Sequence, residues 1–261
     1  MQSKENAKWT FMVYLAGDNN LSMAGDKDLR EMRAVGSTQD VNIVAEFDNA
    51  GDRGTTRYLI KRQGENEEVE SLGETDSGDP AVLLDFVEWA VDKYPADRYA
   101  LILWNHGGGW EPSEMDRIAH QVESRDYNVR EASERSATQL GKSFFRPSLE
   151  EIFSLESPDE RAICSDDGSG HSLDTIELGK VLVQVKKFIG RPLDLLGMDA
   201  CLMSNLEVAY QARTLVNYIV ASEESEPNDG WPYDAVLSKV VENSDIATPD
   251  LATHIVHTYI K

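Results

Sequence analysis

The sequence predicts an α/β fold in which helices cover both faces of a mostly parallel central sheet. Short apolar runs recur along the chain, and stretches whose apolar residues follow helical spacing lie between most of them. Strands buried on both faces read as such runs, and they occur mainly in parallel sheets between helices. With 261 residues and 41% hydrophobic content, the chain can form a substantial core.

The strands are expected at the short, continuous apolar runs. These runs lie at Phe11–Ala16, Val41–Phe47, Tyr99–Trp104, Leu193–Met198 and Tyr218–Ala221, with a shorter strand at Tyr58–Ile60. The sequence therefore predicts a sheet of five or six strands.

Start signals mark the helices between these strands. Helices are expected at Asp79–Tyr94, Asp174–Ile189 and Ser204–Val216, and a last helix starts with Thr248 as N-cap. The first has Asp79 as its N-cap, followed directly by a proline. Asp174 and Glu177 match a capping box, and Ser204 and Glu207 form a similar cap pair for the third helix.

We expect a single domain from Trp9 to Lys261 behind a polar tail at residues 1–8. A charged segment at about 111–161 interrupts it and shows little periodicity, so it is predicted to be a linker or insertion. Lys261 follows an apolar run without a stop signal, and the complete protein is expected to continue further.

The ends of the chain leave its compartment open. The polar start lacks the apolar core of a signal peptide, and no apolar run reaches the length of a membrane span. If an export signal precedes residue 1 in the complete protein, the protein is extracellular or in the cell envelope; otherwise it is cytoplasmic.

The charge balance limits the partners. A formal net charge of -22 would repel nucleic acids and anionic membranes, so basic substrates fit better, although acidity also serves solubility alone. The two cysteines, Cys164 and Cys201, have neither disulfide-framework nor zinc-ligand spacing. Cys164 ends a short apolar run and is expected to be buried and inert.

The first chemical motif places His106 at the carboxyl end of a predicted strand. His106 belongs to the run WNHGGGW at Trp104–Trp110, and ligands bind at this edge of open α/β sheets. The glycines that follow leave backbone N–H groups open to a substrate carbonyl. The alternative is a tight turn with an incidental surface histidine.

The second motif places Cys201 at another strand end, in the run DLLGMDACLMSN at Asp194–Asn205. A helix is expected to follow, and its N-terminal dipole would lower the pKa of the thiol. Strand alternation points Asp199 and Cys201 to the same side. A carboxylate raises the pKa of a neighbouring thiol, so Asp199 is better explained as a partner for a substrate cation. Alternatively, Cys201 is a small core residue and Asp199 a helix cap.

Together, a histidine and a cysteine at two strand ends suit thiol-based acyl transfer. No third catalytic residue is evident from the sequence. The reaction class suggested is peptide hydrolysis, and the alternative is a binding or structural module that keeps the sheet without turnover.

Four segments carry a family resemblance: WTFMVYLAGDNNL, NHGGGW, DACLMSNLEVAYQ and ASEESEPNDGWPYD. The chain from Trp9 onward resembles the clostripain family of cysteine peptidases (family C11), which share the caspase-like α/β/α sandwich. This resemblance implies that His106 and Cys201 form the catalytic dyad, that the Gly107 N–H helps to bind the oxyanion, and that Asp199 lies in the pocket for a P1 Arg or Lys.

The resemblance also implies activation by cleavage within the linker. Arg117, Arg125, Arg135 and Lys142 are the candidate cleavage sites, since exposed basic residues in weakly structured segments are readily cut. Arg is expected to be preferred over Lys at P1, because guanidinium binds a carboxylate bidentately.

Further residues have two interpretations each. Glu223 is a second candidate for reading P1, and Trp231 either lines the substrate cleft or is a core aromatic. The resemblance makes calcium an option, although no cofactor is expected to be required. Asp166 and Asp167 are candidate ligands, but their segment lacks EF-hand register, and a solvated turn is the simpler interpretation.

The sequence lacks residues that three competing types of site would require. HGGGW resembles an esterase oxyanion turn, but no G-x-S-x-G elbow occurs in the chain. Gly141, Lys142 and Ser143 match the end of a P-loop, but Ser136 stands where its first glycine belongs. His254 and His257 are three residues apart on an expected helix without a third ligand nearby, which favours an amphipathic surface over a metal pair.

Overall fold

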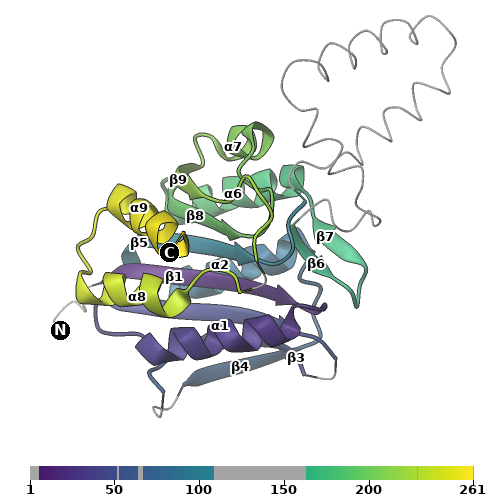
Figure 1. The fold of residues 1–261 in the computed structure, drawn as a ribbon, viewed down its shortest axis with the longest axis horizontal. Helices are drawn as coiled ribbons and strands as arrows, with labels where there is room; N and C mark the ends of the chain where they lie inside the picture. Colours follow the sequence, from purple (N-terminus) through teal and green to yellow (C-terminus); the bar gives the residue numbers. More distant parts are fainter. Residues whose placement is uncertain (1–5, 52, 64–66, 109–162, 228, 261) are drawn as a thin grey trace, which may run out of the picture.

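A single central sheet organises the molecule. The computed structural model describes residues 6–51, 53–63, 67–108, 163–227 and 229–260 (Figure 1). In spatial order, the seven strands of this sheet are β4 (Glu68–Gly73), β3 (Gly54–Leu59), β2 (Val41–Asn49), β1 (Ala7–Gly17), β5 (Ala96–Trp104), β8 (Leu193–Asp199) and β9 (Val216–Val220).

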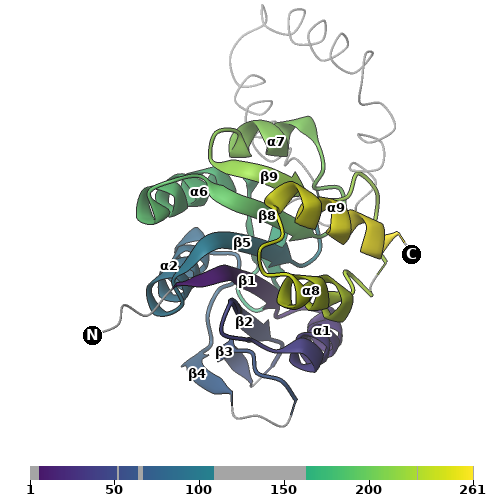
Figure 2. The same ribbon diagram turned by 90° about the vertical axis from the view of Figure 1, so that its left-hand side faces the viewer.

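Helices cover the sheet on both faces, as the view along the sheet in Figure 2 shows. One face carries α1 (Ser22–Val35), α8 (Tyr233–Glu242) and α9 (Thr248–Tyr259). The other carries α2 (Pro80–Lys93), α6 (Thr175–Ile189) and α7 (Leu206–Ala212). Each layer of helices encloses its own apolar core against the sheet, so the sheet is buried from both sides.

The predicted fold class is confirmed, because most of the sheet is parallel. β1 pairs in parallel with both β2 and β5, and the parallel order continues through β8 to β9. β3 and β4 extend the β2 side as antiparallel strands. A small antiparallel pair, β6 (Ile163–Asp166) and β7 (His171–Leu173), lies outside the main sheet.

Local start signals explain where several helices begin. Asp79 caps α2 by accepting the Ala81 N–H at 2.7 Å, and Asp174 and Glu177 form the predicted capping box of α6. The third prediction is wrong in its bounds: α7 begins at Leu206 with Asn205 as N-cap and ends at Ala212. The last helix starts at the expected place, but its N-cap is Ala247, one residue before Thr248.

All predicted strands are present, with shifted ends. β1 starts at Ala7, so the strand takes in the last residues of the predicted tail. β4, β6 and β7 were not predicted, because they are short, polar or half-exposed and lack a continuous apolar run. In the described part of the chain, no helix is both long and apolar enough to span a membrane.

Strand register brings two loops together at one edge of the sheet. β5 and β8 are neighbours, and Trp104 at the end of β5 pairs with Asp199 at the end of β8. Because parallel strands end at the same edge, the residues that follow this pair emerge side by side.

Candidate active site

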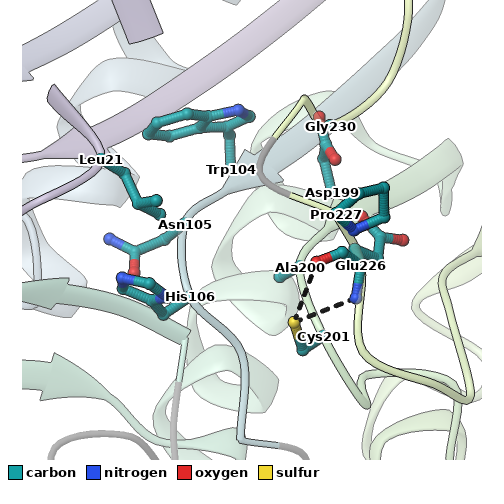
Figure 3. A pocket seen from close by; sticks show the side chains of 10 residues that line it. All are labelled: Leu21, Trp104, Asn105, His106, Asp199, Ala200, Cys201, Glu226, Pro227 and Gly230. Atoms are coloured by element: carbon teal, nitrogen blue, oxygen red, sulfur yellow. Dashed lines mark hydrogen bonds between the residues drawn. The ribbon is translucent and has the colours of Figure 1, made fainter. Parts of the chain in front are cut away.

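His106 and Cys201 occupy equivalent places at the ends of two neighbouring strands. Each follows its strand's last paired residue by two positions, after Trp104 in β5 and Asp199 in β8. Figure 3 shows the two side chains on opposite sides of one hollow, with Asp199 and Glu226 on the side of Cys201. The structure therefore brings together the histidine and the cysteine that the sequence singled out.

Gly107 allows the two strand ends to approach closely. A Cβ atom on Gly107 would lie 2.3 Å from the Cys201 carbonyl oxygen and 3.0 Å from the Cys201 nitrogen. Only a residue without a side chain fits against this backbone. Gly107 also forms an isolated antiparallel bridge with Ile163 of β6, which ties this loop to the small β6–β7 pair.

A loop after β9 holds the thiol of Cys201. The backbone N–H of Glu226 donates to Cys201 Sγ at 3.2 Å, and the Leu202 N–H donates to the Glu224 carbonyl at 3.3 Å. The helix expected after Cys201 is present as α7, but its N-cap is Asn205 in place of Ser204 and the helix begins at Leu206. The amide donor of Glu226 fixes the position of the sulfur beside the loop.

Asp199 is a buried carboxylate at the base of this hollow. Its side chain is 4% exposed, and its Oδ2 accepts the Trp231 N–H at 3.1 Å and the Tyr233 hydroxyl at 3.0 Å. Burial raises the pKa of Asp199, while hydrogen bonds from Glu226, Trp231 and Tyr233 act in the opposite direction. The strand end that carries the thiol thus also presents an acidic group to the hollow.

Glu226 forms a carboxyl pair with Asp199. Burial, the charge of Asp199 and a hydrogen bond between the two side chains raise the pKa of Glu226 to about 9. At neutral pH the carboxyl group of Glu226 is therefore protonated, and its O–H donates a hydrogen bond to Asp199. Its Oε2 is buried and has no hydrogen-bond partner.

A third acidic side chain, Asp28 of α1, lies behind this pair. It is 1% exposed, and burial together with the charges of Asp199 and Glu31 raises its pKa to about 8. Three carboxyl groups thus crowd a region whose burial disfavours negative charge. A cation that entered the hollow would favour the ionised forms of these carboxyl groups.

The other candidates from the sequence lie elsewhere. Glu223 is exposed and does not line the hollow, where Glu226 takes the place expected for it. Trp231 is a core aromatic, 3% exposed, and only its backbone N–H reaches Asp199. Cys164 is fully buried, and burial raises the pKa of its thiol, as expected for an inert cysteine. Arg117, Arg125, Arg135 and Lys142 lie outside the described residues.

The calcium candidates do not form a metal site. The Asp166 carboxylate accepts the N–H groups of Ser77 and Ser169 at 2.9 and 2.8 Å, and Asp167 lies exposed in the following turn. Within the described ranges, no group of three or more acidic, histidine or cysteine side chains is arranged to hold a metal ion. These residues do not fit the ion, and calcium dependence stays a prediction.

Sequence reasoning missed Glu226 and Asn20. Glu226 was one of several acidic residues in the loop EESEPNDG, and nothing in the letters shows which of them turns inward. Asn20, whose Oδ1 lies 2.6 Å from His106 Nε2, belongs to the opening segment LAGDNNL, which carried the resemblance without a stated role. Only the fold brings this segment to the end of β5.

Comparison with known proteins gives matches in sequence and in fold. A model of the clostripain family matches residues 13–131 and 153–261. Clostripain from Hathewaya histolytica is 28% identical over 267 residues, which cover 90% of this chain and 43% of that protein.

Two solved structures share the fold. A secreted C11 cysteine protease from Bacteroides thetaiotaomicron, bound to an irreversible peptide inhibitor, gives a TM-score of 0.66 at 22% identity, over 97% of this chain and 58% of that chain. An inactive zymogen C11 protease from Parabacteroides distasonis gives a TM-score of 0.61 at 20% identity, over 98% of this chain and 58% of that chain. The chain thus spans only about half the length of these relatives.

Proposed function

The chain belongs to the clostripain family, and on this basis we propose that it is a cysteine endopeptidase that cuts peptide bonds after a basic residue. The observation that carries the proposal is the register of β5 and β8, which places His106 and Cys201 around one hollow with buried carboxyl groups. A nucleophile, a proton donor and a cation-binding pocket are the parts that this reaction needs.

The chemistry follows from these positions. The Cys201 thiolate attacks the scissile carbonyl carbon, and the resulting oxyanion is bound by backbone N–H groups near Gly107 and Cys201. His106 then donates a proton to the leaving amine, which breaks the peptide bond and leaves a thioester on Cys201. Water, deprotonated by His106, hydrolyses the thioester and regenerates the thiolate.

The carboxyl pair supports a preference for basic P1 residues. A guanidinium or ammonium group beside Asp199 would favour the ionised form of Glu226, which would then release its proton. Two carboxylates would face the cation, and Arg can bind them bidentately. We therefore expect Arg to be cleaved faster than Lys, and neutral residues to be cleaved poorly.

Peptides that differ only in the P1 residue test this specificity. Asp199→Asn is expected to lower kcat/KM for Arg peptides by a free energy of roughly 2 to 5 kcal/mol, because it removes a desolvated charge partner. Its effect on peptides with a neutral P1 should be small. Parent-like cleavage of Arg peptides by this variant would move the P1 contact away from Asp199.

We also propose that the enzyme cuts its own linker. The charged segment at about 111–161 follows His106 closely in the sequence and contains Arg117, Arg125, Arg135 and Lys142. One of the structural relatives is an inactive zymogen. Mass spectrometry should find two fragments in the parent protein, the first of which ends in a basic residue of the linker. Cys201→Ala should remain an intact chain. An intact parent protein with full activity would contradict this proposal.

A further inference from the structure

His106 contacts a side chain for which the sequence offered no role. Its Nε2 lies 2.6 Å from Oδ1 of Asn20, an exposed residue in the turn between β1 and α1. The two residues are 86 positions apart in the chain, so the fold brings them together.

The residues before Asn20 and His106 share the same two hydrogen-bond acceptors. Nδ2 of Asn19 donates to the carbonyl oxygens of Ala16 and Ser165 at 3.1 and 2.9 Å. Nδ2 of Asn105 donates to the same two carbonyl oxygens. Asn19 and Asn105 are both buried, at 7% and 4% exposure. The backbone at Asn20 and the backbone at His106 are therefore fixed relative to each other.

Further hydrogen bonds hold this turn in place. Oδ1 of Asn19 accepts the Leu21 N–H at 2.9 Å, and Asp18 accepts the N–H groups of Asp167 and Gly168 at 2.7 and 3.1 Å. Asn20 thus stands on a rigid turn, although its own side chain is exposed. A rigid support of this kind suits a residue that orients another side chain.

The contact selects one tautomer of the imidazole. An amide oxygen can only accept, so Nε2 of His106 must carry the proton in this hydrogen bond. In the neutral ring, Nδ1 is then the basic nitrogen. The titratable groups that line the hollow with His106, within the described residues, are Asp199, Cys201 and Glu226.

We propose that Asn20 is the positioning residue of the catalytic histidine: its amide oxygen holds Nε2–H of His106, so that Nδ1 exchanges protons with the thiol and the leaving amine. The inference rests on the proposed peptidase function and adds a third member to the dyad. Asn20 itself touches neither substrate nor sulfur in this role.

Kinetics of two Asn20 variants test the role in catalysis. Asn20→Ala should lower kcat by about 10- to 100-fold, because the ring loses its orientation, while KM stays within about two-fold. The thermal midpoint should not change, since the side chain is exposed. Asn217→Ala, at an exposed asparagine of β9, is the matched control and should match the parent in both. A parent-like kcat in Asn20→Ala would overturn the proposal.

The variant Asn20→Asp tests whether position 20 acts by accepting a hydrogen bond from Nε2–H of His106. A carboxylate also accepts from Nε2–H, so this variant should retain more activity than Asn20→Ala. Its negative charge should raise the pKa of His106 by about one unit and move the limb of the kcat profile that His106 governs to higher pH. If the amide instead donates to Nε2, Asn20→Asp loses activity as Asn20→Ala does and the proposed tautomer is wrong.

A measurement without substrate keeps this test independent of the proposed function. The imidazole titration of His106, followed by NMR in the parent and in Asn20→Asp, should show the higher pKa whether or not peptides are cleaved. An inactive parent protein with this shift would reject the peptidase function and retain the contact. An unchanged titration would reject the contact itself.

Discussion

At the scale of single residues, the carboxyl group of Glu226 links the stability of the protein to pH. Its pKa rises from the ordinary value of 4.5 to about 9, because burial and Asp199 both disfavour its charged form. The folded protein therefore binds this proton more tightly than the unfolded chain does. The contribution of Glu226 to the free energy of unfolding is therefore fully present below about pH 4.5 and is lost as the pH rises towards 9.

The variant Glu226→Gln should remove this pH dependence. We expect the free energy of unfolding of this variant to be closest to that of the parent near pH 5. At pH 8.5 the variant should exceed the parent most, because the unfolded parent has lost the Glu226 proton and folding must bind it again. Urea unfolding at the two pH values measures the difference. Glu223→Gln, at an exposed position of the same loop, is the control and should show no such trend. If Glu226→Gln changes the free energy of unfolding equally at both pH values, Glu226 does not form a protonated pair with Asp199 in the folded protein.

Gly107 is the residue whose replacement should damage the site most directly. In Gly107→Ala the new methyl group would collide with the Cys201 backbone, at 2.3 Å from its carbonyl oxygen. We expect a loss of about 1 to 3 kcal/mol in stability together with a large fall in kcat.

A glycine outside the site provides the comparison. Gly179 lies inside α6, where an added Cβ would meet only Gln211 at 3.4 Å. Gly179→Ala should be neutral, or stabilising by up to about 1 kcal/mol, with parent-like kcat. Equal kcat in both glycine variants would mean that the loop approach at Gly107 does not matter for activity.

At the scale of elements, the capping box of α6 gives a stability prediction that is separate from catalysis. Asp174→Ala removes the acceptor of the Glu177 N–H, which lies at 2.6 Å, and should cost about 1 kcal/mol. Thermal denaturation should show a lower midpoint, while kcat/KM per folded molecule stays unchanged. Thr248→Ala should have less effect, because α9 starts without a side-chain cap. A larger loss in Thr248→Ala would show that the caps are wrongly assigned.

The elements that were predicted share strong local signals. β1, β2, β5 and β8 are almost entirely buried, so each appears in the sequence as an apolar run. The burial of both sheet faces predicted the parallel arrangement, and the general place of ligand sites in such sheets predicted that His106 and Cys201 lie at the same sheet edge.

The elements that were missed depend on tertiary contacts. The strand β4 has Val69 at 58% exposure and lies at the edge of the described sheet, next to β3, so its sequence carries little strand signal. The start of α7 was misplaced because Ser204 and Glu207 imitate a cap pair, whereas Asn205 makes the cap in the fold. The sequence could not identify Glu226 and Asn20, because their contacts with Cys201 and His106 form only when loops from separate parts of the chain meet at one sheet edge.

At the scale of the whole molecule, the net charge of -22 should attract basic substrates over long distances. We expect kcat/KM for peptides with several basic residues to fall as ionic strength rises from about 0.01 to 0.15 M, because the Debye length shrinks from about 30 to about 8 Å. A peptide with a single P1 Arg and a neutral remainder should respond less. If the two peptides show equal salt dependence, the net charge does not attract basic substrates over long distances, and the electrostatic contribution to kcat/KM comes from the P1 pocket.

The central claim is that Cys201 is the nucleophile of a peptidase that reads a basic P1 residue. Mass spectrometry after brief treatment with a peptidyl-arginyl chloromethyl ketone tests it most directly, since this reagent alkylates a thiolate much faster when its P1 side chain is bound. The account predicts a single adduct on Cys201, which is prevented in Asp199→Asn and absent with a P1 Glu analogue. An adduct on Cys164, or labelling of Cys201 at equal rates by both reagents, would contradict it.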